Sequence, residues 1–272
     1  MKKQKRLKFI ILGLIILCLI IYICLSSGNQ RTEIDFLDVG QGDSSLIKLP
    51  NNKIVLIDGG PDNLVLKRLG ENLPFYRRQI DFIVLSHPHD DHLIGLLEVI
   101  NRYQVGTIIY VGEENNPEIL TLLLQKAKAR NIRLIELKNE MKINYSSECF
   151  FDLLNPESLG IKKDDNNSIV VKLNCNRLVA LFSGDNSSAV ETALLKTKTD
   201  WSANILKASH HGSKTANSEA FLRAIGPRLF VISVGVDNRF GHPDSEILKR
   251  AESLKISIKR TDKMGTIKVF GK

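Results

Sequence analysis

Short apolar runs separated by turn residues open the folded part of this chain and predict three β-strands. They lie at residues 34–39, 45–49 and 53–57, and the last two flank Pro50-Asn51-Asn52, which predicts a hairpin. Of the 272 residues, 43% are hydrophobic, enough to bury a substantial core. We therefore expect strands to dominate this end of one large domain.

Farther along, apolar runs of strand length alternate with longer stretches of helical length. The predicted strands lie at 81–85, 107–111, 132–136, 150–154, 168–173, 178–183, 204–208, 229–233, 256–259 and 266–270. The predicted helices lie at 92–102, 117–130, 187–197, 217–225 and 244–254. Sheets whose faces can be covered by helices imply a layered α/β fold.

An uncharged apolar run at residues 9–25 is slightly shorter than the ~20 residues of a membrane-spanning helix. Five lysines and arginines precede it, and positive residues stay on the cytoplasmic side of a membrane. A signal sequence cleaved near Ser26-Ser27-Gly28, which would give a secreted protein, is the alternative to an anchor. We predict a single-pass protein of the cell membrane, with a cytoplasmic basic segment at 1–8, an anchor at 9–27, a linker at 28–32 and an extracytoplasmic domain at 33–272.

Charge and cysteines add little to this picture. The net charge is +8, but five of the 38 basic residues precede the apolar run, which leaves 33 basic residues against 30 acidic ones. This mild excess gives weak support for nucleic acid as a partner. Only Cys149 and Cys175 follow the apolar run, and without Cys-x-x-Cys spacing we expect core or turn residues rather than metal ligands. An oxidising compartment would permit a disulfide, but separate predicted strands give no reason to pair them.

The six histidines are confined to three short segments. Three lie in His87-Pro88-His89-Asp90-Asp91-His92, between a predicted strand and a predicted helix. In an extended loop, side chains at i and i+2 point the same way, so His87 and His89 can bind one ion. Asp91 and His92, where the helix begins, then face a neighbouring ion. The spacing therefore predicts two metal ions side by side.

The four residues His87, His89, Asp91 and His92 match the His-x-His-x-Asp-His signature of the metallo-β-lactamase superfamily, which this chain resembles. Further segments resemble the extracytoplasmic nuclease-like domain of the ComEC competence proteins: Phe36–Ser44, Leu56–Gly60, Asn166–Ser168, Phe182–Asp185, His210–Lys214, Gly241–Pro243 and Arg260–Asp262. The resemblance covers roughly residues 33 to 270. It implies an αββα sandwich with its site at one edge, here preceded by one N-terminal transmembrane helix.

The resemblance also implies that Asp185, at the end of a predicted strand, bridges two cations, although an aspartate there can equally cap the following helix. One histidine of the His210-His211 pair should complete the second metal site. We favour His211 as the ligand and His210 as a catalytic group, but a shift of one residue in the strand end would exchange them. The predicted metal ligands are His87, His89, Asp91, His92, Asp185 and His211, and Asp91 also has a catalytic role.

Other polar residues are candidates for contacting substrate or supporting a ligand. Gly212-Ser213-Lys214 offers amide, hydroxyl and ammonium donors to a phosphate, or forms a solvated turn. His242 and Asn238 lie in a polar loop at a strand end, which more often lines a pocket than a core. Three aspartates near the first strands can accept the outward N–H of a ligating histidine or simply form turns; they are Asp38, Asp43 and Asp58.

One departure from the superfamily concerns the first metal. Many members supply another histidine between the first cluster and the bridging aspartate, but none lies between His92 and His210 here. The corresponding place holds Asp164-Asp165-Asn166-Asn167-Ser168, where an oxygen of Asn167 or a neighbour can substitute, unless the segment is only a polar turn. Because oxygen ligands favour harder ions, we expect two divalent ions that are either Zn²⁺ or Mn²⁺.

The leading hypothesis is a membrane-anchored dinuclear hydrolase that cleaves the phosphodiesters of DNA through a hydroxide held between the metals. The second is a hydrolase of a cell-envelope group, such as a phosphorylcholine esterase, or a β-lactamase; the weakly basic body suits a small substrate. The third is a non-catalytic DNA-binding accessory of the DNA-uptake machinery, because a chain with one membrane segment cannot itself be a channel. The general acid is left open between His210, His242 and water, and the oligomeric state is left open too.

Overall fold

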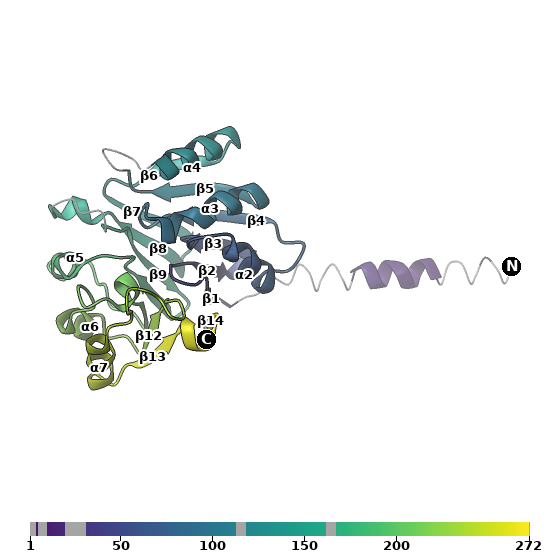
Figure 1. Cartoon of the computed structure of the whole chain (residues 1–272). Coiled ribbons are helices and arrows are strands. Elements are labelled where there is room, and N and C mark those ends of the chain that lie inside the picture. The colour runs from purple at the N-terminus through teal and green to yellow at the C-terminus, as the bar shows by residue number, and fades with distance from the viewer. Residues whose placement is uncertain (1–3, 5–9, 20–30, 113–117, 162–166, 272) are drawn as a thin grey trace.

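The computed structural model describes residues 4, 10–19, 31–112, 118–161 and 167–271 (Figure 1). Residues 10–19 are helical. No helix within the described residues has both the length and the apolar character needed to cross a membrane. Most of the predicted basic segment, much of the predicted anchor and linker, and residues Asp164 to Asn166 lie outside the described residues.

Two mixed seven-stranded sheets form the centre of the domain. The first has the order β14-β1-β2-β3-β4-β5-β6, and β3 to β6 run parallel. Its strands are β1 (Glu33–Phe36), β2 (Ser45–Leu49), β3 (Lys53–Ile57), β4 (Gln79–Val84), β5 (Gln104–Tyr110), β6 (Arg133–Glu136) and β14 (Ile267–Phe270). The predicted hairpin is confirmed, because β2 and β3 pair antiparallel across the turn η1 (Pro50–Asn52).

The second sheet has the order β13-β12-β11-β10-β9-β8-β7, and β10 to β13 run parallel. Its strands are β7 (Glu140–Ser146), β8 (Cys149–Leu154), β9 (Val170–Cys175), β10 (Leu178–Phe182), β11 (Ile205–Lys207), β12 (Leu229–Ile232) and β13 (Ser257–Arg260). A short 3-10 turn, η2 (Pro156–Leu159), follows β8. The last strand, β14, leaves this half and pairs with β1 of the other sheet.

Helices cover the outer face of each sheet (Figure 1). Over the first sheet lie α2 (Leu64–Asn72), α3 (Asp90–Arg102) and α4 (Glu118–Ala129). Over the second lie α5 (Ser188–Leu194), α6 (Glu219–Ile225) and α7 (Ser245–Ser253), while the short α8 (Thr261–Met264) precedes β14. A separate apolar core fills the space between the sheets, with Phe36, Phe151 and Phe182 among its buried members. The predicted αββα sandwich is confirmed.

The sequence reasoning missed the helices α2 and α8 and the strand β7. Helix α2 is short, contains Gly70, and fully buries only Val65 and Leu69, so its periodicity is weak. Strand β7 does alternate, with Met141, Ile143 and Tyr145 half-buried against the central core, and this period of two was available in the sequence.

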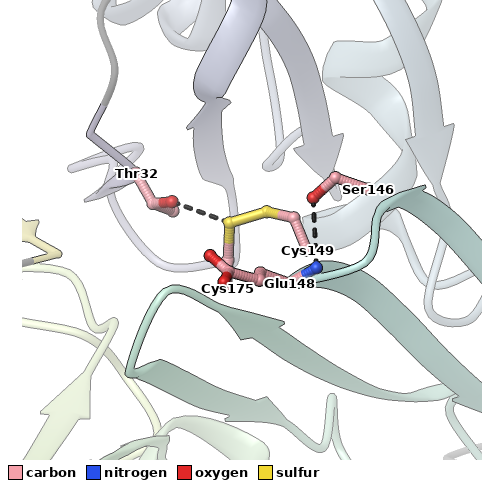
Figure 2. The surroundings of a disulfide bond; sticks show 5 residues. All are labelled: Thr32, Ser146, Glu148, Cys149 and Cys175. Atoms are coloured by element: carbon pink, nitrogen blue, oxygen red, sulfur yellow. Dashed lines mark hydrogen bonds between the residues drawn. A yellow bond between two sulfur atoms is a disulfide. The ribbon is translucent and has the colours of Figure 1, made fainter.

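Cys149 and Cys175 form a disulfide, which the sequence reasoning gave no reason to expect (Figure 2). The two residues face each other in the antiparallel pair of β8 and β9, with their Cα atoms 4.1 Å apart. Both are buried in the central core, as predicted, and neither lies with the clustered histidines. Register between strands, which sequence periodicity does not fix, is what brings them together.

Candidate metal centre

Five predicted ligands come from loops that follow parallel strands, at the carboxyl edge of the two sheets. His87 follows β4, Asp91 and His92 lie in the first turn of α3, Asp185 follows β10, and His211 follows β11 in the turn η3 (Ser209–Gly212). Each sheet therefore supplies part of one cluster, as is common for sites at the carboxyl ends of strands.

A close backbone approach holds the α3 turn against the loop after β1. The Asp43 amide donates to the Asp91 carbonyl at 3.1 Å. Gly42 has a φ of +152°, and a Cβ there would overlap the same carbonyl and the Pro61 ring. Only glycine fits this position without displacing the start of α3.

His92 is fully buried and is oriented through its Nδ1 atom. This nitrogen lies 2.9 Å from Asp58 Oδ2, while the other Asp58 oxygen accepts the Ser86 amide at 2.7 Å. Its Nε2 atom faces Asp185 Oδ1 at 3.5 Å. Burial alone would lower the pKa of His92, but the carboxylates of Asp185 and Asp58 outweigh it and raise that pKa well above its usual value.

His87 is also fully buried, and two hydroxyls share its Nδ1 atom. Ser86 Oγ and Ser168 Oγ each lie 3.1 Å from it. Its Nε2 atom lies 4.0 Å from Asp185 Oδ2. Burial and the neighbouring charge of His92 hold the pKa of His87 well below its usual value, so this ring is neutral and can donate a lone pair.

His211 completes the opposite side of the cluster. Its Nδ1 atom donates to the Ser233 carbonyl at 3.0 Å, and its Nε2 atom lies 3.1 Å from Asp91 Oδ2 and 3.7 Å from Asp185 Oδ2. Burial alone would lower the pKa of this ring, but Asp185 and Asp43 raise it to about 10. The excess of carboxylates therefore favours positive charge at this point.

Asp185 lies between the two sides. One of its oxygens faces both His87 and His211, and the other faces His92. The Asp185 amide donates to Ser168 Oγ at 2.9 Å, which fixes the loop. A carboxylate in this position can contact two ions at once, as the resemblance implies.

Several buried polar atoms of the cluster lack hydrogen-bond partners in the described part of the chain, as is expected where a metal ion binds. Among the described residues, the buried atoms of this cluster without a hydrogen-bond partner include His87 Nε2, His92 Nε2 and Asp185 Oδ1. Buried polar atoms are rarely left unpaired, because the lost hydration costs about 1–3 kcal/mol each. Nitrogen and carboxylate oxygen are ligands that divalent zinc and manganese accept. These residues therefore fit a divalent cation.

Three sets of donor atoms within 4.8 Å of one another occur among the described residues, and all contain His92. One adds His87 and Asp185, and a second adds Asp91 and His211. The third adds Asp43 and Asp58; Asp58 contacts His92, while one Asp43 oxygen pairs with Lys207 and the other has no hydrogen-bond partner within the described part of the chain. The first two sets lie side by side and share His92, whose one free nitrogen can serve a single ion.

The remaining predicted histidines lie at the rim of the cluster. His89 is half-buried, with its ring 4.4 Å from the His87 ring between centroids. His210 is more exposed than His211, and its Nε2 atom lies 3.9 Å from Asp185 Oδ2. His242 lies next outward, 5.8 Å from His210 between ring centroids.

The three early aspartates differ in what they contact. Asp58 and Asp43 lie against His92 and His211, at 2.9 Å and 3.3 Å respectively. Asp38 does not reach the cluster; its carboxylate pairs with Arg68 of α2 at 2.8 Å.

The other predicted residues differ in burial and in their partners. Ser213 is buried and shares its hydroxyl with Thr215, whereas Lys214 is exposed. The amide of Asn238 is engaged by the backbone of its own loop. Asn167 is buried directly before Ser168, but the preceding Asp164 to Asn166 lie outside the described residues.

Sequence reasoning missed three side chains that support the ligands: Ser86, Ser168 and Lys207. Ser86 directly precedes the histidine motif, and Lys207 interrupts an otherwise apolar strand, so both carried a signal. Lys207 is buried, donates to Asp43 Oδ2 and to the Ala208 carbonyl, and lowers the pKa of Asp43 to about 2 although burial would raise it. Asp43 is thereby kept ionised beside His211.

Comparison with known proteins shows the family of this chain. Residues 37–236 match the family model of the metallo-beta-lactamase superfamily. The chain belongs to this superfamily. Igni18, a metallo hydrolase from Ignicoccus hospitalis, shares the fold with a TM-score of 0.57 over 88% of this chain and 99% of its own, at 12% identity.

Two curated relatives are competence proteins by name. ComE operon protein 3 of Bacillus subtilis is 29% identical over 92% of this chain, and competence protein ComA of Neisseria gonorrhoeae is 28% identical over 89%. The predicted likeness to the ComEC competence proteins is therefore confirmed. The chain spans only about a third of the length of these relatives, 34% and 33% respectively.

Proposed function

We propose that this protein is a metal-dependent phosphodiesterase that cleaves DNA outside the cytoplasm. The observation that carries the proposal is the set of buried, unpaired donor atoms of His87, His92 and Asp185, which converge within the described part of a metallo-β-lactamase fold. Divalent cations bound there would supply Lewis acidity for phosphate oxygens and activate water for attack.

Residues of the chain would bind the ions and transfer protons. His87, His89, His92 and His211 would hold the ions together with Asp185, which lies between the two sides of the cluster. Asp91 stays ionised, because hydrogen bonding and charge from His211 lower its pKa against the opposite effect of burial. As a half-exposed carboxylate it can take a proton from attacking water. His210, at the exposed side of Asp185, is placed to exchange a proton with the leaving oxygen.

The location outside the cytoplasm is part of the proposal. Disulfides persist in oxidising compartments, and the Cys149–Cys175 bond lies in the structural core. Basic residues before the apolar run at 9–25 favour an anchor with the domain outside. A signal sequence cleaved from a secreted protein remains the alternative.

The DNA substrate rests on the relatives. Proteins named for competence match almost the whole chain, which supports a role beside the DNA-uptake machinery.

The test is cleavage of end-labelled DNA by the purified full chain loaded with Zn²⁺ or Mn²⁺. We expect metal-dependent cleavage that Asp185→Ala lowers by at least 100-fold, an order-of-magnitude estimate for loss of metal-site chemistry. Asp38→Asn, a carboxylate paired with Arg68 away from the cluster, is the matched control. Cleavage of phosphorylcholine esters or β-lactams with DNA left intact would contradict the nuclease proposal. DNA binding that survives Asp185→Ala, without cleavage under any ion, would favour the non-catalytic accessory.

A further inference from the structure

A line of aromatic rings leads from the metal cluster to the surface. The His211 ring is 6.3 Å from His210, His210 is 5.8 Å from His242, and His242 is 6.1 Å from Phe240, all between centroids. The last two rings are nearly parallel, at 15°. Exposure rises along the line, from 2% for His211 to 55% for Phe240. The line therefore connects the chemistry to solvent.

Phe240, at the outer end of this line of rings, does not contribute to an apolar core. It belongs to none of the three apolar cores of the described residues. The guanidinium of Arg239 lies over its ring, 5.0 Å from the centroid. Arg239 itself is exposed. An exposed aromatic beside a cation near a site is a feature of ligand surfaces.

The loop that carries Phe240 is held in one shape. The Asn238 amide donates to the carbonyls of Gly235 and His242, at 3.2 and 2.7 Å, and its oxygen accepts the His242 amide at 3.0 Å. At the loop's start, the Val234 amide donates to the buried hydroxyl of Thr261 at 2.8 Å. Asn238 thus presents the ring rather than contacting substrate, and a prearranged ring binds at low entropic cost.

We propose that Phe240, with His242 and Arg239, forms a stacking platform for an unpaired nucleobase next to the metal cluster, so that the enzyme prefers single-stranded DNA. Every base has a face that stacks on an aromatic ring, and each such contact strengthens binding by roughly 5- to 150-fold. Bases within a duplex are already stacked on their neighbours and are not available. This inference rests on the proposed function, whose substrate it names more narrowly.

The charge beside the Phe240 ring favours a nucleotide over a phosphorylcholine group as the ligand. A quaternary ammonium group is itself a cation, and neighbouring cations repel it. Here Arg239 lies over the Phe240 ring, and Lys214, also exposed, follows the His210-His211 pair in the chain. Both cations can instead attract the anionic phosphates of the DNA strand that carries the base.

Binding by the full chain without metal tests the platform independently of catalysis. Fluorescence anisotropy in EDTA would compare a single-stranded oligonucleotide, the same strand with abasic residues, and the duplex. Phe240→Ala should weaken binding of the normal strand at least fivefold and leave the abasic strand and duplex unchanged, whereas Phe240→Trp should retain it. Val236→Ala, at a still more exposed apolar residue of the same loop, is the matched control.

The inference is overturned if the wild-type chain binds the normal and abasic strands equally, or if Phe240→Ala binds the normal strand as tightly as wild type. Its failure is distinguishable from failure of the proposed function. Base-dependent binding without any metal-dependent cleavage would retain the platform and reject the nuclease. Cleavage whose ratio between single-stranded and duplex DNA is unchanged in Phe240→Ala would retain the nuclease and reject the platform.

Discussion

Each of the three buried histidine rings in the cluster is held at its Nδ1 atom, and its Nε2 atom faces the carboxylates of the cluster. In His92 and His211 the Nδ1 atoms are engaged by Asp58 and by the Ser233 carbonyl. The Asp58 contact was one of two roles that the sequence offered, because an aspartate at a strand end beside glycines can support a histidine or form a turn. The Ser233 carbonyl could not, since any residue supplies a carbonyl and only the fold selects which one.

Asp58→Asn should weaken metal binding by roughly 10- to 100-fold, the usual effect of removing a carboxylate behind a ligating histidine. The amide is the same size but makes a poorer acceptor, so the His92 ring loses orientation and basicity. Competition with a chromophoric chelator measures the affinity. Asp38→Asn, which touches Arg68 instead, should match wild type. Equal affinity for Asp58→Asn and wild type would refute this role.

Asp35 gives a pH dependence that is independent of the metal cluster. Burial raises its pKa to about 6 from 3.8, although Lys48 at 2.8 Å opposes the shift. The folded state therefore binds this proton more tightly than the unfolded state does. The resulting stability is full below about pH 4 and is lost as the pH rises through 6, an effect on the order of 2–3 kcal/mol.

Asp35→Asn should remove that dependence, so its stability relative to wild type should increase between pH 4 and 7. Urea unfolding of the metal-free proteins at several pH values measures the difference. Parallel stability curves for the two proteins would show that Asp35 does not titrate in this range.

At the scale of elements, the loops after parallel strands carry the chemistry and the strands set their positions. Sequence periodicity located β4, β10 and β11 closely enough to place the predicted ligands at their ends. It did not give register, because a strand's pattern is the same whichever residues it faces. The pairing of β8 with β9, and with it the disulfide, is a consequence of register.

Replacing both Cys149 and Cys175 by serine should lower the free energy of unfolding by about 3 kcal/mol, given the 26-residue separation that the bond closes. Metal binding should be retained, because the pair lies in the central core rather than among the ligands. Urea unfolding with and without a reductant checks this. A wild-type protein whose stability is unaffected by reductant would show that the bond contributes nothing.

The turn that carries Asp185 depends on Gly184, whose φ is +50°. A Cβ there would overlap Ser168, the residue that supports both His87 and Asp185. Gly184→Ala should therefore weaken metal binding and lower stability. Gly70→Ala is the matched control: it lies in α2 with open space around it and should raise stability by about 1 kcal/mol. Chelator competition and urea unfolding would separate the two, and identical behaviour would contradict this account.

At the scale of the whole molecule, the cluster exists only because two sheets meet at one edge. The histidine signature was sufficient to predict the superfamily fold, since four ligands at fixed spacing rarely occur by chance. Contacts between the two sheets could not be predicted from the sequence. Lys207 and Asp43 are 164 residues apart, and only the assembled sandwich shows that this buried pair supports His211.

The most direct test of the metal centre is the metal content of the purified full chain after loading with Zn²⁺ or Mn²⁺ and removal of free ions, measured by mass spectrometry. We predict two ions per wild-type chain and fewer in Asp185→Ala, because that carboxylate faces ligands on both sides of the cluster. A wild-type chain that retains no ion, or an Asp185→Ala variant that retains as many as wild type, would contradict a two-metal site built on Asp185.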